Sequence, residues 1–150
     1  MKTLFALALL ASIALACPAH ADRCDDLAGQ LKGQIDGLSV GKTAANVIYL
    51  SHPAAKQLRL GCASRKVSNE LLATSETRKP KPEFISLVAK ASAVIFTVPL
   101  DTALKGATRC IKRLGILRGD DIKMRFRRLD MHCTRTKTDA TIAISRGRDE

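Results

Sequence analysis

Beyond residue 21 the chain has two histidines, and both stand near side chains that could exchange a proton with them. His52 follows Ser51 directly, and His132 lies two residues after Asp130. A serine, a histidine and an aspartate that meet in space can act as nucleophile, base and orienting acid in hydrolysis. No nucleophile-elbow motif surrounds Ser51, however, and the carboxylates are scattered rather than paired as in glycosidases. We therefore predict no catalytic residues, and a hydrolase is the least favoured of three functional interpretations.

Four cysteines lie in the same part of the chain: Cys24, Cys62, Cys110 and Cys133. Zinc sites usually contain closely spaced Cys or His pairs, whereas these four are far apart in the sequence. An even number of cysteines in an oxidising compartment is typical of disulfides. Three pairings are possible, and we favour Cys24 with Cys62 and Cys110 with Cys133, because each pair joins a predicted helix to the strands that follow it. We expect no metal and no cofactor.

Residues 1–21 have the pattern of a cleaved secretory signal peptide. Lys2 precedes an apolar run over residues 4–16, and Ala19 and Ala21 are the small residues that a signal peptidase recognises. The apolar run is too short to span ~30 Å of hydrocarbon. Lipidation at Cys17 is an alternative, but Ala14 stands where a lipobox has a large aliphatic residue. We predict a single mature domain over residues 22–150, periplasmic or secreted, with no transmembrane span.

Helical periodicity marks two segments. Residues 22–37 combine acidic residues in the first turn with an apolar stripe of Leu27, Leu31, Ile35 and Leu38. Gly29, Gly33 and Gly37 recur beside this stripe, which indicates either close approach of another backbone or a helix that ends early. The second segment runs from Pro82 to Leu114. We expect Pro99 to break it, and Asp101 or Thr102 to cap the continuation.

Alternating patterns predict the strands. Extended runs are expected over residues 46–51, 57–63 and 67–74, and one longer strand over residues 122–133. The apolar phase of the longer strand shifts by one residue at Arg128, which indicates a β-bulge. A return strand over residues 140–144 completes a hairpin. The element order is then α-β-β-β-α-β-β: an α+β two-layer domain with an antiparallel sheet of about five strands, two main helices on one face and two disulfides.

The charge is uneven along the chain. The whole sequence has 25 Lys and Arg against 14 Asp and Glu, a net charge of +11. Residues 22–77 are nearly neutral, with 7 basic and 6 acidic residues, whereas residues 78–150 have 17 basic and 8 acidic residues. An array of cations raises the local concentration of polyanions. The predicted anion-binding residues are Arg109, Lys112, Arg113, Arg118, Lys123, Arg125, Arg127 and Arg128, with Lys123, Arg125 and Arg127 on one sheet face and Arg128 at the bulge.

These observations favour a non-catalytic, periplasmic or secreted small binding protein whose basic hairpin face takes an anionic envelope component or an acidic partner. The candidate partners are anionic lipid, lipopolysaccharide, an acidic polymer or an acidic protein. Nucleic acid is disfavoured, because single-strand binders usually add stacking aromatics, and Phe126 is expected to point inward. A basic surface that only aids solubility stays an open alternative.

The element order is similar to that of secretion-chaperone-like α+β folds. A likeness at the level of the fold does not by itself imply a function, and no motif in the chain identifies a family. The second interpretation is an accessory or chaperone-like protein of a secretion or envelope assembly. Such a protein would recognise its partner through a sheet edge or through the helix face that carries Gly29, Gly33 and Gly37.

Overall fold

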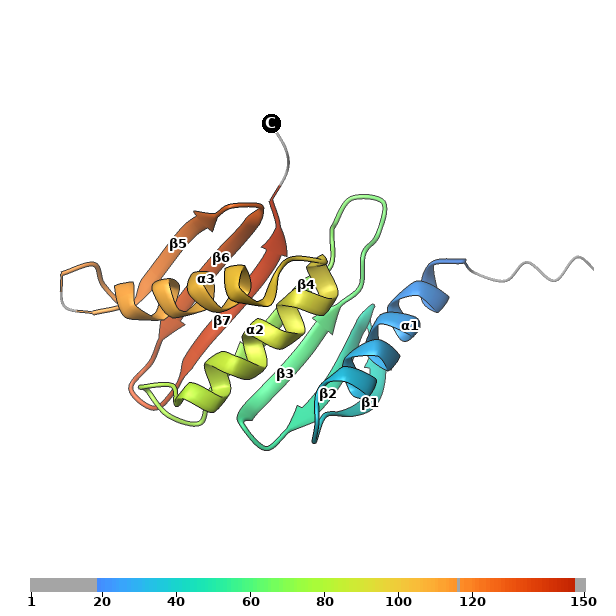
Figure 1. Cartoon of the computed structure of the whole chain (residues 1–150), viewed down its shortest axis with the longest axis horizontal. Coiled ribbons are helices and arrows are strands. Elements are labelled where there is room, and N and C mark those ends of the chain that lie inside the picture. The colour runs from blue at the N-terminus through green and yellow to red at the C-terminus, as the bar shows by residue number, and fades with distance from the viewer. Residues whose placement is uncertain (1–18, 116, 148–150) are drawn as a thin grey trace, which may run out of the picture.

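The computed structural model describes residues 19–115 and 117–147 (Figure 1). Residues 1–18, which include most of the predicted signal peptide and Cys17, lie outside the described residues. The helices are α1 (Ala19–Gln34), α2 (Pro82–Phe96) and α3 (Leu100–Arg113). The strands are β1 (Ser39–Ala44), β2 (Val47–His52), β3 (Ala55–Gly61), β4 (Glu70–Thr74), β5 (Asp121–Phe126), β6 (Leu129–Arg135) and β7 (Ala140–Arg146).

The strands form one antiparallel sheet with the order β1-β2-β3-β4-β7-β6-β5. Figure 1 shows α1, α2 and α3 against the same face of this sheet, and no helix of the described residues covers the opposite, open face. An α+β fold with one antiparallel sheet is therefore confirmed. The expected strand count of about five is wrong, because the described sheet has seven strands.

One of the missed strands is β1, at the edge of the sheet. All six of its residues are exposed, so its sequence lacks the apolar alternation that marks a half-buried strand. A two-residue turn connects it to β2, and both turn residues, Ala45 and Asn46, have positive φ angles of 49° and 63°. Two such residues are what a type I′ hairpin requires, but alanine is unusual at the first of these positions, so the local sequence does not mark the turn.

The expected β-bulge at Arg128 is wrong. Phe126 pairs with Leu129, so Arg127 and Arg128 form a two-residue turn between β5 and β6. Arg127 has a φ of 56°. A two-residue turn shifts the apolar phase of the sequence just as a bulge does, and no glycine or asparagine marks it. The predicted hairpin is therefore a meander of three strands, β5, β6 and β7.

The break at Pro99 is confirmed, but its capping is not as expected. Helix α2 ends at Phe96, and its C-cap residue Thr97 has a left-handed φ of 51°. Helix α3 begins at Leu100 with Pro99 itself as N-cap residue, so neither Asp101 nor Thr102 caps it. Within residues 19–115 and 117–147, none of the helices has the length and apolar content that a membrane span requires.

Of the two alternatives for the glycines beside the α1 stripe, close approach of another backbone does not occur at Gly29 or Gly33. A Cβ atom built on Gly29 or Gly33 would meet nothing within 4 Å, and both residues are exposed. The face of α1 that packs on the core carries Ala28, Leu31 and Ile35 instead. Gly29 and Gly33 therefore lie on the opposite, solvent-exposed side of the helix.

Two disulfides tie the helical layer to the sheet, as predicted. Cys24 on α1 is joined to Cys62, which follows β3, and Cys110 on α3 is joined to Cys133 on β6. All four cysteines are buried in a single hydrophobic core that lies between the helices and the inner face of the sheet.

Candidate functional site

The structure distributes the eight predicted anion-binding residues over three places around strand β5. Lys123 and Arg125 lie on β5, where exposed residues alternate with half-buried ones and face away from the helices. Arg127 and Arg128 form the turn at one end of β5. The other four, Arg109, Lys112, Arg113 and Arg118, belong to α3 and to the loop that leads to the opposite end of β5. Lys123 and Arg125 thus share one sheet face, as expected, whereas Arg127 lies in the turn rather than on the strand.

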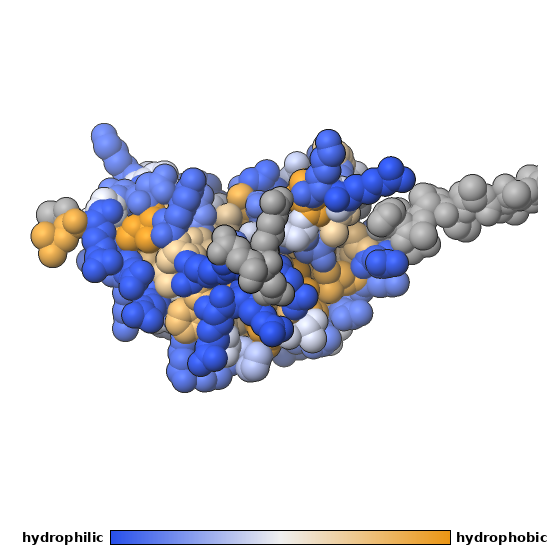
Figure 2. All heavy atoms as spheres, turned by 90° about the horizontal axis from the view of Figure 1, so that it is seen from above, coloured by the Kyte–Doolittle hydropathy of each residue, from blue (hydrophilic) through white to orange (hydrophobic). Residues whose placement is uncertain are grey.

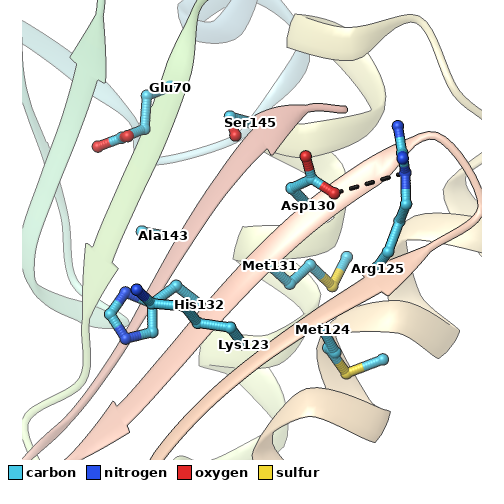
Figure 3. Close-up of a pocket in the computed structure, with 9 residues that line it drawn as sticks. All are labelled: Glu70, Lys123, Met124, Arg125, Asp130, Met131, His132, Ala143 and Ser145. Carbon is cyan, nitrogen blue, oxygen red and sulfur yellow. Dashed lines mark ion pairs between the residues drawn. The ribbon is translucent and has the colours of Figure 1, made fainter. Parts of the chain in front are cut away.

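A shallow hollow of about 440 Å³ lies on the open face of the sheet (Figure 3). Its floor is strand β7, which contributes only the small side chains of Ala143 and Ser145. The strand register places taller side chains on both sides of them. Ser145 lies between Glu70 and Asp130, and Ala143 pairs with His132. The hollow therefore follows from two small residues in one central strand.

Carboxylates neutralise much of the positive charge on this open face. The guanidinium of Arg125 pairs with Asp130, with 3.5 Å between Nε and Oδ1 (Figure 3). His132 Nε2 lies 2.8 Å from Asp121 Oδ1, and Glu70 stands across the hollow on β4. The open face thus presents acids and bases in similar number. Arg125, one of the predicted anion-binding residues, therefore has an acidic partner on this face.

The structure does not bring Ser51, His132 and Asp130 together as a catalytic triad. Ser51 is on β2 and His132 is on β6, with β3, β4 and β7 between them in the sheet. Four strand spacings of about 4.8 Å separate the two residues by roughly 19 Å. Asp130 pairs with Arg125 rather than with His132, and in the described residues no serine or threonine hydroxyl hydrogen-bonds to His132.

His52 has a structural position. Its Nδ1 accepts a hydrogen bond from the backbone N–H of Ala54 at 3.0 Å, and its Nε2 lies 3.0 Å from the backbone oxygen of Asp36. With Nδ1 as acceptor, Nε2 carries the hydrogen and donates it to Asp36. His52 therefore connects the β2–β3 turn to the chain that follows α1.

Arg127 and Arg128, in the β5–β6 turn, lie at the end of the sheet that also carries the β3–β4 loop and the junction of α2 with α3. Figure 2 looks onto this end and shows mainly hydrophilic residues, in blue. The guanidinium of Arg146, on β7, donates a hydrogen bond to the backbone oxygen of Phe96 at 2.7 Å. The backbone N–H of Gly147 donates to the oxygen of Arg128 at 2.9 Å.

Three loops meet at the opposite end of the sheet. Arg78, in the β4–α2 loop, donates to the backbone oxygen of Thr136 at 2.8 Å and pairs with Asp120 at 3.4 Å. Arg135 donates through its guanidinium to the backbone oxygen of Leu114 at 3.3 Å, and through its backbone N–H to that of Asp120 at 2.8 Å. These contacts hold the β4–α2 loop, the α3–β5 loop and the β6–β7 turn together.

The turn at this end is also fixed by an ionised carboxylate. Thr136 Oγ1 donates to Asp139 at 2.6 Å, and Lys56 Nζ donates to it at 3.1 Å. The hydrogen bond from Thr136 and then that from Lys56 lower the pKa of Asp139. A lowered carboxyl pKa stabilises the fold above the ordinary carboxyl pKa, and this contribution is lost as the pH falls through the lowered value.

Six cations gather on these loops and on the adjoining end of α3, and we call them the basic loop cluster. No ion pair in the described part of the chain joins any of them to an acid. Sequence reasoning missed three of them, although the basic surplus of residues 78–150 includes them. The basic loop cluster consists of Lys79, Lys81, Lys112, Arg113, Arg118 and Lys137.

An apolar hollow of about 330 Å³ adjoins the basic loop cluster. It lies between the β4–α2 loop, α2 and α3, and it is lined mainly by Pro80, Pro82, Ile85, Leu104 and Ile111. Lys112 is at its rim. Cations and apolar side chains therefore share one surface on the helical side of the sheet.

Among the described residues, no group of three or more His, Cys, Asp and Glu side chains could hold a metal ion. Comparisons with protein-family models, with curated proteins and with solved structures gave no match.

Proposed function

We propose that this chain is exported and acts as a non-catalytic binding protein for an anionic component of the cell envelope. The basic loop cluster supports this proposal, because its six cations lie on loops and a helix end that meet at one end of the sheet, and none of them has an acidic partner in the described residues. Cations that are not neutralised locally produce the potential that attracts a polyanion. On the open sheet face, by contrast, Arg125 is paired with Asp130.

The test is the salt dependence of binding to heparin, a soluble polyanion. The unaltered, oxidised protein should bind at about 150 mM salt, and its affinity should fall steeply as salt is added, since binding releases counterions. Reversing Lys81, Lys112 and Arg118 to glutamate removes three exposed cations of the basic loop cluster. We expect this variant to bind at least about tenfold more weakly, with a shallower salt slope.

A matched control changes the net charge equally. Lys32, Arg65 and Lys66 are exposed cations of the nearly neutral part of the chain, and reversing them should reduce binding much less. A further variant with Arg127 and Arg128 reversed measures the contribution of the opposite end. Equal losses in the two variants with three reversed charges would show that net charge alone attracts the polyanion. No binding by the unaltered protein would overturn the proposal.

Export makes a separate prediction about the N-terminus. Expressed with its own leader in a secreting bacterial host, the chain should be recovered from the periplasm or the medium with Asp22 as its first residue. Intact mass spectrometry under non-reducing conditions would show this cleavage and two disulfides together. A recovered chain that still begins at Met1, or that carries lipid on Cys17, would contradict it.

The second candidate is an accessory protein that binds an envelope partner through a sheet edge. Strands β1 and β5 each have only one neighbour in the described sheet, and an unpaired edge can accept a strand from another chain. Such a complex depends on backbone hydrogen bonds. A stoichiometric protein partner that remains bound at high salt would favour this candidate over the polyanion.

A further inference from the structure

The loop between α3 and β5 carries a leucine in an unusual environment. Leu117 is 98% exposed, and Figure 1 shows this loop projecting beyond the sheet on the β5 side. Three of the five large hydrophobic side chains that are exposed in the described residues, Leu100, Leu104 and Leu117, belong to α3 and this loop. The exposed apolar surface is thus concentrated in the segment that is rich in cations.

Backbone hydrogen bonds close the loop behind Leu117. The N–H of Gly115 donates to the oxygen of Gly119 at 3.0 Å, and the N–H of Gly119 donates to the oxygen of Gly115 at 2.7 Å. The guanidinium of Arg135 anchors the base of the loop at Leu114. The leucine is therefore held at the tip of a closed and anchored loop.

The surroundings of Leu117 are basic. Arg118 follows it in the loop, and Lys112 and Arg113 end the helix that leads into the loop. In the described residues none of these three has an acidic partner. The contacts of Arg78 with Thr136 and Asp120 bring the other two loops of the basic loop cluster to the same end.

We propose that this loop docks the protein on an anionic lipid bilayer, an inference that rests on the proposed function and specifies its ligand. Leu117 would enter the apolar layer beneath the headgroups, while the basic loop cluster contacts their phosphates. Anionic membranes attract each nearby Lys or Arg, and an inserted apolar side chain adds to the binding. A soluble polyanion would use the cations but would offer no apolar phase to Leu117. The combination of cations with an exposed leucine therefore favours the bilayer.

The chain contains no tryptophan, so one introduced residue gives a specific signal. In Leu117→Trp, the emission should shift to shorter wavelength when vesicles of equal parts phosphatidylglycerol and phosphatidylcholine are added. Heparin should bind without shifting the emission. Val67→Trp is the control, since Val67 is 60% exposed in the β3–β4 loop, at the other end of the sheet. Its emission should not shift with either ligand.

A second substitution measures how much the leucine contributes to affinity. Leu117→Ser should bind the same vesicles about tenfold or more weakly, because the transfer of a leucine side chain out of water is lost. Its affinity for heparin should be unchanged. Unchanged vesicle binding by Leu117→Ser, or an unshifted emission of Leu117→Trp on bound vesicles, would overturn the bilayer proposal. If the bilayer proposal fails but the protein still binds heparin, the proposed function stands. If the unaltered protein does not bind heparin, both the proposed function and the bilayer proposal are overturned.

Discussion

Replacing Cys110 and Cys133 together by alanine is expected to lower the free energy of unfolding by about 3 kcal/mol. This disulfide closes a loop with a sequence separation of 23, and loop entropy in the unfolded chain gives a value of that size. The bond matters here because α3 faces the sheet with the small residues Ala103, Gly106 and Ala107. Such residues bury little apolar surface, so the cross-link contributes a large share of what holds α3 in place.

Thermal unfolding followed by circular dichroism would measure this effect. For a domain of this size we expect a decrease in Tm of roughly 10–15 °C. The unaltered protein in a reducing agent is the control, and it should be at least as destabilised because both of its disulfides are open. A Tm that falls by less than about 3 °C in the alanine variant would show that packing alone holds α3 on the sheet.

Substituting leucine for Gly106 is expected to destabilise the fold by about 2–3 kcal/mol, through overpacking. A Cβ atom at this position would lie 2.6 Å from Met131 Cε and 2.9 Å from Phe126 Cδ1. The side chains of Met131 and Phe126 therefore fill the space that a side chain at position 106 would need, and they would have to shift to admit one.

Gly29→Leu is the matched control for Gly106→Leu, because both glycines are helical and receive the same new side chain. A Cβ at Gly29 would meet nothing within 4 Å, so only helix propensity changes there. We expect that control to raise the free energy of unfolding by about 0.5–1 kcal/mol. Urea denaturation should show a lower free energy of unfolding for Gly106→Leu and a higher one for Gly29→Leu. Equal effects would show that helix propensity, rather than packing, decides the outcome at Gly106.

Periodicity predicted the elements that bury one face. The apolar stripe that contains Leu31 and Ile35 predicted α1, and the alternation that contains Leu58 and Leu60 predicted β3. Periodicity missed β1, since an edge strand with six exposed residues has no apolar pattern to read. It also read the β5–β6 turn as a bulge, because Arg127 and Arg128 have neither the glycine nor the asparagine that marks a two-residue turn.

The candidate site was less predictable than the fold. A surplus of cations is visible in composition, but the side on which each cation lies depends on register and on loop contacts between distant residues. The pairing of Arg125 with Asp130 follows from the β5–β6 register. The gathering of Lys79, Lys112 and Lys137 at one end depends on how the β4–α2 loop, α3 and the β6–β7 turn pack, and no local sequence pattern encodes that.

Neither disulfide connects the part of the chain before the β4–α2 loop to the part after it. Cys24–Cys62 lies wholly before the β4–α2 loop, and Cys110–Cys133 lies wholly after it. A protease that cuts within this exposed loop would therefore leave two separate polypeptides, each closed by its own cross-link. The pairing of β4 with β7, the ion pair of Lys56 with Asp139 and the shared core would keep them together. The molecule thus has the layout of a split protein, whose two fragments meet at the centre of the sheet.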